Sequence, residues 1–179
     1  MTNHDTLTVI IGPSGAGKST HVAELLRHTD AQLVRTETDR PQRGQDDNDT
    51  HIFISTDEFT KKRDTNYYLG HGSMLGYNYG LPHLPDTKQP KIVLLRAPFV
   101  PEVWRHRPDA RVIQIEAPVD TLVQRLAARG DHARIDPERL QLEIAMGHKL
   151  AQYTISTDVP FDQSYTEITR IWNIIQSET

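Results

Sequence analysis

Short apolar runs alternate along the chain with stretches in which apolar residues recur every three or four positions. The runs are of strand length and largely β-branched, which is typical of strands buried on both faces of a parallel sheet. We expect five of them, at Leu7–Ile11, 31–35, 92–95, 112–115 and Tyr153–Ser156.

The intervening periodic stretches predict helices. We expect them at 18–28 and 119–129, after the N-cap and first-turn signal Asp136-Pro137-Glu138, and at 164–177. Strand–helix alternation of this kind predicts an α/β fold, with a parallel sheet flanked by helices. At 179 residues the chain fits one domain.

The alternation of strands and helices is interrupted between residues 36 and 90, where the composition becomes polar and rich in Gly, Pro, Asp and Tyr. Short strands are expected at 51–54, 67–69 and 77–79, with a helix at 57–62. We therefore predict a small β-rich insertion into a core of residues 1–35 and 91–179. It is expected to hang over the carboxyl edge of the sheet, where open α/β sheets bind ligands.

The segment between the first strand and the first helix predicts a phosphate-binding loop. It reads Gly12-Pro13-Ser14-Gly15-Ala16-Gly17-Lys18-Ser19-Thr20. Glycines let the backbone approach an anion, and amide groups and the helix dipole face it. Lys18 is expected to reach the β and γ phosphates of ATP, and Ser19 to bind Mg²⁺. We expected the Lys18 side chain to face solvent.

The composition limits the classes of binding partner and of chemistry that the protein can have. The net charge is −4, which provides no general attraction for nucleic acid. No apolar run approaches membrane-spanning length, and the absence of cysteine excludes disulfides and thiolate chemistry. We expect a cytoplasmic protein acting on a small molecule, with the oligomeric state open between monomer and homodimer.

Two groups of arginines could surround a transferred phosphoryl group. Arg40 and Arg43 lie in the insertion, three residues apart, and could fork onto one phosphate. Arg125 and Arg129 stand one helical turn apart, ahead of a connector at about 129–137 that could close as a lid; Arg139 follows it. The simpler alternatives are a solvated basic turn at Arg40 and an ordinary charged helix pair.

The ordered set of motifs resembles the guanylate kinase family. It comprises the phosphate-binding loop, Arg-x-x-Arg, a His-x-Phe strand followed by Ser-Thr-Asp-Glu-Phe, a Tyr-x-Tyr-Gly turn and Arg-Leu-x-x-Arg-Gly. The resemblance implies ATP-dependent phosphorylation of a nucleoside monophosphate, usually GMP. It implies that Arg40, Arg43, His51 and Tyr79 bind the acceptor, that Lys18, Arg125, Arg129 and Arg139 act in catalysis, and that Asp46 stands where a glutamate is usual.

The chain departs from the family where guanine is read by acids and a hydroxyl. Leu81 follows Tyr79-Gly80 in place of Ser or Thr, the segment 69–72 has no acid, and Arg96 stands where aspartates are usual. The N1–H and amino donors of guanine would lack hydrogen-bond partners, which lowers the discrimination in favour of guanine. Mg²⁺ would depend on Ser19, phosphates and water. The Thr-His-Ile around His51 resembles instead the ribose 1,5-bisphosphate phosphokinases, and Arg96 could meet an additional acceptor phosphate.

Three readings therefore stay open at this point. The first is a small-molecule kinase, with GMP as the family default and ribose bisphosphate as its rival. The second is an ATPase or nucleotide-binding regulator, which would turn over ATP equally fast without an acceptor. The third is a non-catalytic guanylate-kinase-like interaction module; such modules usually lose the phosphate loop, which is complete here.

Overall fold

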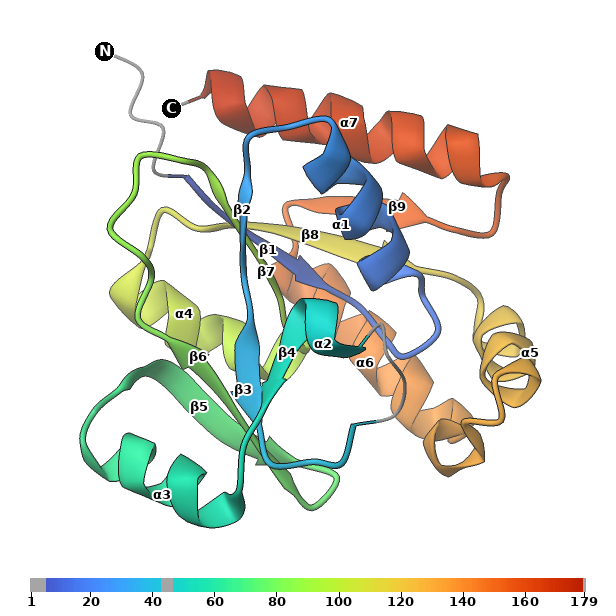
Figure 1. Cartoon of the computed structure of the whole chain (residues 1–179). Coiled ribbons are helices and arrows are strands. Elements are labelled where there is room, and N and C mark those ends of the chain that lie inside the picture. The colour runs from blue at the N-terminus through green and yellow to red at the C-terminus, as the bar shows by residue number, and fades with distance from the viewer. Residues whose placement is uncertain (1–5, 43–46, 179) are drawn as a thin grey trace.

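A five-stranded parallel sheet forms the centre of the computed structural model, which describes residues 6–42 and 47–178. Its strand order is β2-β7-β1-β8-β9 (Figure 1), with the strands spanning Leu7–Ile11 (β1), Gln32–Val34 (β2), Lys91–Leu94 (β7), Arg111–Glu116 (β8) and Tyr153–Ser156 (β9). All five strands expected from the apolar runs are present. The prediction of an α/β fold built on a parallel sheet is confirmed.

Alternate side chains of this sheet enter two separate cores. On β1, Ile10 belongs to a core shared with the helices Lys18–Arg27 (α1), Val119–Ala128 (α5), Pro137–Leu150 (α6) and Phe161–Ser177 (α7). Its neighbours Val9 and Ile11 face the opposite core, which receives the helix Val100–His106 (α4) and residues Leu69 and Leu81 of the second sheet. Among the described residues, no helix is long and apolar enough to cross a bilayer.

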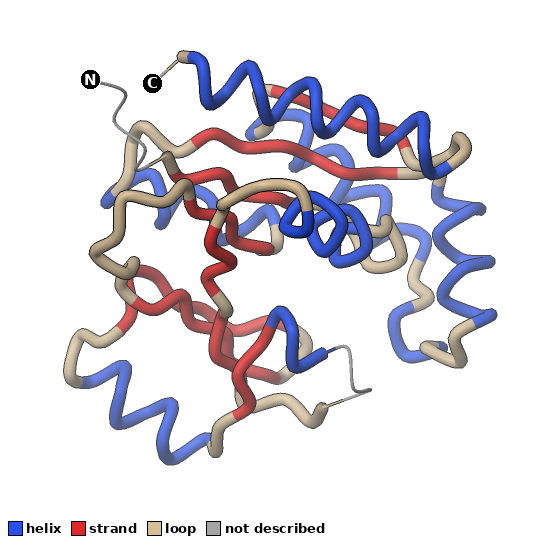
Figure 2. Tube along the Cα trace, turned by 45° about the horizontal axis from the view of Figure 1, so that its top comes forward, coloured by secondary structure: helices blue, strands red, loops and turns tan. Residues whose placement is uncertain are grey.

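A second, four-stranded sheet is formed by the chain between β2 and β7. Its strands lie below those of the central sheet in Figure 2. Its order is β4-β3-β6-β5, where the strands are Thr36–Thr38 (β3), His51–Phe53 (β4), Tyr68–Met74 (β5) and Tyr77–Pro82 (β6). β3 pairs parallel with β4 and antiparallel with β6. The helix Thr56–Asp64 (α3) packs beside it through the buried Phe59, which stacks on Tyr68 with ring centroids 4.8 Å apart.

Several elements differ from those expected. β3 was not predicted, and neither was α4, which begins after a 3₁₀ turn at Ala97–Phe99 (η1). The short helix at Asp47–Thr50 (α2) was not predicted either, and Asp46, which stands where the family has a glutamate, lies outside the described residues. α7 begins at Phe161 rather than at 164, and the connector after α5 carries a 3₁₀ turn at His132–Arg134 (η2).

The loop between β1 and α1 crosses the carboxyl ends of the central strands. Gly12 has a φ of 145°, and a Cβ there would clash with the carbonyl oxygen of Ile115 on β8. Glycine at this position therefore lets the loop lie directly on the sheet edge. The second sheet approaches the same edge, so the phosphate-binding loop faces the insertion.

Candidate active site

A cleft of about 660 Å³ separates the phosphate-binding loop from the second sheet. Residues from the loop, both sheets and the connector after α5 line it. They are Ser14, Gly15, Gly17, Lys18, Ser19, Thr20, Thr36, Arg40, Thr50, His51, Tyr79, Leu94, Leu95, Arg96, Phe99, Arg129, Gly130, Asp131 and Arg134. The cleft therefore brings together most of the residues that the sequence pointed to.

The Lys18 side chain does not face solvent as expected. It is half-buried, and its Nζ donates to the carbonyl oxygens of Gly12 at 2.7 Å and Pro13 at 2.8 Å. Burial lowers the pKa of this ammonium to about 7; the nearby charge of Arg96 acts in the same direction, and Glu143 opposes it. Ser19, at the first turn of α1, is exposed in the cleft.

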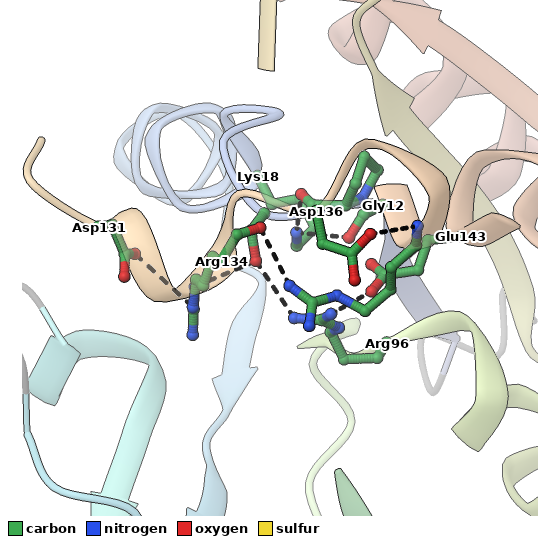
Figure 3. A network of polar contacts seen from close by, with 10 residues as sticks. Gly12, Lys18, Arg96, Asp131, Arg134, Asp136 and Glu143 are labelled. Atoms are coloured by element: carbon green, nitrogen blue, oxygen red, sulfur yellow. Dashed lines mark hydrogen bonds and ion pairs between the residues drawn. The ribbon is translucent and has the colours of Figure 1, made fainter. Parts of the chain in front are cut away.

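The guanidinium groups of Arg96 and Arg134 lie beside the phosphate-binding loop (Figure 3), and both bind the buried hydroxyl of Ser14. Arg96 donates to Ser14 Oγ at 3.2 Å from the end of β7, and Arg134 donates to the same oxygen at 3.1 Å from η2. Arg96 also forms an ion pair with Glu143 of α6, and Arg134 lies 3.6 Å from a carboxylate oxygen of Asp131. The cations beside the loop are thus held in place by two acids.

The end of the cleft that lies against the second sheet is lined by Arg40 and by the aromatic rings of His51, Tyr79 and Phe99. Arg40 is buried, donates to the carbonyl oxygen of Pro41 at 3.0 Å and lies 5.0 Å from the ring centre of Phe53. The ring of His51 lies 6.3 Å from that of Tyr79, which in turn lies 6.2 Å from Phe99. Arg43, predicted to act with Arg40, lies outside the described residues.

The two predicted lid arginines, Arg125 and Arg129, and the neighbouring Arg139 have different surroundings. Arg129 lines the cleft. Arg125 is instead bound to Thr157, with Nη1 at 2.9 Å from Oγ1 and Nη2 at 2.7 Å from the carbonyl oxygen, and its Nη1 lies 3.3 Å from the carbonyl oxygen of Gly15. Arg139 donates to the carbonyl oxygen of Arg134 at 3.0 Å. Arg125 and Arg139 therefore contact the backbone that frames the site.

Thr157 gives a test of this frame. Its hydroxyl accepts the Arg125 bond and lies 3.0 Å from the carbonyl oxygen of Ala16 in the loop. Thr157→Val is expected to lower the free energy of unfolding by about 1–3 kcal/mol, because buried partners lose their hydrogen bonds. Urea denaturation measures this. The exposed Thr154→Val, on the strand β9 that precedes Thr157, is the control; an equal change in both variants would contradict the assigned contact.

No motif or spacing in the sequence pointed to His21. It is buried on α1, with Nδ1 2.9 Å from the carbonyl oxygen of Gly17 and Nε2 2.8 Å from the hydroxyl of Ser164 on α7. Burial lowers the pKa of its imidazole, although the hydrogen bond to Gly17 opposes the shift. A neutral histidine therefore links the loop to the last helix.

The lining is strongly positive. Its lysine and arginine side chains are Lys18, Arg40, Arg96, Arg129 and Arg134, whereas Asp131 is the one carboxylate among the described residues that line it. Such a surface binds anions and stabilises charge that develops on a moving phosphoryl group. Glu143 was not predicted, whereas Arg134 belongs to the arginine group that the sequence singled out, although no separate role was assigned to it.

Comparison with known proteins agrees with this geometry. The guanylate kinase family model matches residues 4–172. A guanylate kinase of Frankia casuarinae is 31% identical over 150 residues, which cover 76% of this chain and 82% of the relative. A ribose 1,5-bisphosphate phosphokinase PhnN of Bradyrhizobium diazoefficiens is 28% identical over 174 residues, which cover 92% and 86%.

The solved structures give the same fold. A crystal structure of guanylate kinase from Anaplasma phagocytophilum superimposes with a TM-score of 0.75 at 19% identity, covering 97% of this chain and 87% of that one. A family match over nearly the whole chain, a complete phosphate-binding loop and a cationic cleft beside it lead to one assignment. The chain belongs to the guanylate kinase family and is an ATP-dependent phosphotransferase of the nucleoside monophosphate kinase type.

Proposed function

We propose that this enzyme transfers the γ-phosphoryl group of ATP to a phosphate-bearing acceptor without a purine base, of the ribose 1,5-bisphosphate class. The observation that carries the proposal is the apolar end of the cleft, where a guanine reader needs polar groups. Leu81 stands where the family resemblance places a hydroxyl, and Gly70 belongs to the segment 69–72 in which it places an acid; both line a small cavity there.

That cavity has a volume of about 10 Å³. A single water molecule needs roughly 10–15 Å³, so a purine base does not fit. Its lining is Thr36, Gly70, Tyr79, Gly80, Leu81, Leu95, Phe99 and Val103, which contains no charged side chain. The hydrogen-bond donors of guanine would be left without partners, which weakens binding and discrimination.

Arg96, the third difference from the family pattern, favours an acceptor that carries an additional phosphate. Arg96 stands in place of an expected aspartate and lines the cleft with its guanidinium near Ser14. An acceptor with a second phosphate would meet this charge, whereas GMP carries only one phosphate. The relative named ribose 1,5-bisphosphate phosphokinase covers more of this chain than the Frankia guanylate kinase does, at slightly lower identity.

In the proposed mechanism the protein supplies position and positive charge. The backbone amides of the loop and the ammonium of Lys18 hold the β and γ phosphates. To do so, Lys18 gives up its hydrogen bonds to the carbonyl oxygens of Gly12 and Pro13 and donates to the phosphates instead. Arg129 and Arg134, on the connector that we propose as a lid, stabilise charge on the transferred group. The oxygen that accepts the phosphoryl group belongs to a phosphate of the acceptor and is already anionic. No general base is therefore required.

Mg²⁺ fits this cleft as an ion held mainly by phosphate oxygens. Ser19 offers an exposed hydroxyl at the start of α1, whereas Asp131 and Glu143 are engaged with arginines. Mg²⁺ commonly keeps several waters and binds through few protein groups. When bound, it would neutralise charge on the β and γ phosphates.

An ADP-release assay over a panel of acceptors tests the proposal. The panel contains ribose 1,5-bisphosphate, ribose 5-phosphate, GMP, AMP and no acceptor. We expect the highest kcat/KM with ribose 1,5-bisphosphate. Equal ADP release without any acceptor would support an ATPase instead, and a clear preference for GMP would overturn the base-free acceptor.

GMP is the second candidate, because the Frankia relative and several others of about 30% identity are named guanylate kinases. The hydroxyl of Thr36 lines the cleft and could accept one hydrogen bond from a base. The same panel separates the two candidates.

The lowered pKa of Lys18 predicts proton uptake on ATP binding. Its ordinary value of 10.5 falls to about 7, so the side chain is mostly neutral above pH 7 in the free enzyme. Phosphates favour the ammonium, so binding between pH 7 and 10.5 takes up as much as one proton, and ATP affinity falls as the pH rises through this window. Calorimetry at about pH 8.5 in buffers of different ionisation enthalpy measures the uptake. Lys18→Met should show none; equal uptake in that variant would assign the proton elsewhere.

A further inference from the structure

Phe99 separates the cleft from the small apolar cavity. It is the last residue of η1, between the end of β7 and α4, and it is half-buried. It lines both spaces, as do Thr36, Tyr79 and Leu95. The cleft and the cavity therefore share a wall, and in this wall the rings of Phe99 and Tyr79 lie 6.2 Å apart.

The ring of Phe99 rests directly on the backbone of β5 at Gly72. A Cβ on Gly72 would clash with Phe99 Cε1 and would lie 3.2 Å from its Cδ1 and 3.4 Å from its Cζ. Gly70, two residues earlier on the same strand, faces α4 in the same way, since its Cβ would lie 2.9 Å from Glu102 Cγ. Absence of side chains at these two positions thus allows η1 and α4 to pack against the strand.

We propose that Phe99, seated on Gly72, is the specificity-determining residue that keeps a purine base out of the acceptor end of the cleft. This deepens the proposed function, on which it rests for the nature of the acceptor. Without the ring, the cleft and the cavity would join into one space walled by Leu81, Leu95, Val103 and Tyr79. A flat heteroaromatic base could enter that space and stack against the tyrosine.

The ratio of affinities for GMP and ribose 5-phosphate isolates the contribution of the base, since the two ligands share a 5-phosphorylated ribose. Calorimetry without ATP gives this ratio for each variant. We expect a ratio near one in the wild type. Phe99→Ala should raise it about tenfold, the lower end of the range by which apolar pockets respond to a change in space, because the hydrogen-bond donors of guanine still lack partners there.

Gly72→Ala provides an independent route to the same state, because the added methyl group displaces the ring while Phe99 itself is unchanged. The double variant should match Phe99→Ala, since the methyl group then has nothing to displace. Val103→Ala is the matched control: Val103 lines the cavity but not the cleft, so its loss enlarges the cavity and leaves the separation intact. Its ratio should stay near one.

A ratio near one in both Phe99→Ala and Gly72→Ala overturns the proposal, and so does a wild-type ratio of ten or more. If Gly72→Ala does not fold, Phe99→Ala against Val103→Ala decides. Because this assay measures binding without ATP, it is separate from the acceptor panel. Failure to phosphorylate ribose 1,5-bisphosphate would overturn the proposed function and leave the role of Phe99 to be judged by the ratios.

Discussion

Lys18→Met is expected to lower kcat/KM by a factor of about 10³ while the protein stays folded. A preorganised positive charge on transferring phosphoryl groups contributes on the order of 10²–10³ or more to the rate, and the methionine keeps the length of the chain but lacks the ammonium. Steady-state ADP release with the best acceptor of the panel measures the loss. Lys88→Met, which replaces an exposed lysine outside the cleft, is the control and should retain full activity.

The fold should tolerate this change for a physical reason. The ammonium of Lys18 is half-buried, and burial lowers its pKa to about 7 because the charged form is poorly solvated. The charge therefore adds little to stability near neutral pH, and urea denaturation of Lys18→Met should give an unfolding midpoint close to that of the wild type. Full activity in the folded variant would show that the lysine does not act on the phosphates.

The second large effect is expected at Arg96. Arg96→Gln should lower kcat/KM for ribose 1,5-bisphosphate by about ten- to a hundredfold, the value of one hydrogen bond to a charged group. The KM for ATP and the activity with ribose 5-phosphate should change much less, because only the additional phosphate is proposed to meet this guanidinium. The measurement is the ratio of kcat/KM for the two acceptors in each variant.

The Arg96→Gln variant also affects Glu143, and a second substitution at Glu143 separates this effect from the loss of phosphate binding. Its side chain is 11% exposed and is ion-paired with Arg96, so removing the arginine alone leaves a poorly solvated carboxylate unpaired. Arg96→Gln combined with Glu143→Gln removes both charges and should recover stability without recovering the preference for the bisphosphate. If the double variant still prefers the bisphosphate, Arg96 does not read the second phosphate.

Much of the fold could be predicted from local patterns. The strands of the central sheet are buried on both faces, so their apolar runs are continuous and easy to locate. The phosphate-binding loop needs a fixed spacing of glycine, lysine and serine between a strand and a helix. These features depend on residues that are neighbours in the sequence.

The features that could not be predicted depend on contacts between distant segments. β3 consists of Thr36-Glu37-Thr38, a polar triplet that becomes a buried strand because it pairs with β4 and β6. The two carboxylate oxygens of Glu37 accept hydrogen bonds from Lys62, and one also accepts from Tyr68. No local pattern indicates such partners.

The candidate site shows the same division. Lys18, Ser19, Arg40, His51 and Tyr79 line the cleft as their motifs suggested. The guanidinium of Arg125, in contrast, donates hydrogen bonds to Thr157, which follows β9 and lies 32 residues away in the sequence. Helical spacing predicts which arginines share a face, but it does not predict what that face meets.

A crystal structure of the enzyme with ADP and ribose 1,5-bisphosphate would test the central claim most directly. The account predicts the β phosphate of ADP at the backbone amides of the loop beside Lys18. It places one acceptor phosphate at Arg40 and the other at Arg96. An acceptor bound outside the cleft, or a matching soak in which GMP occupies the cleft with its base against Phe99 and Leu81 while the bisphosphate does not bind, would contradict it.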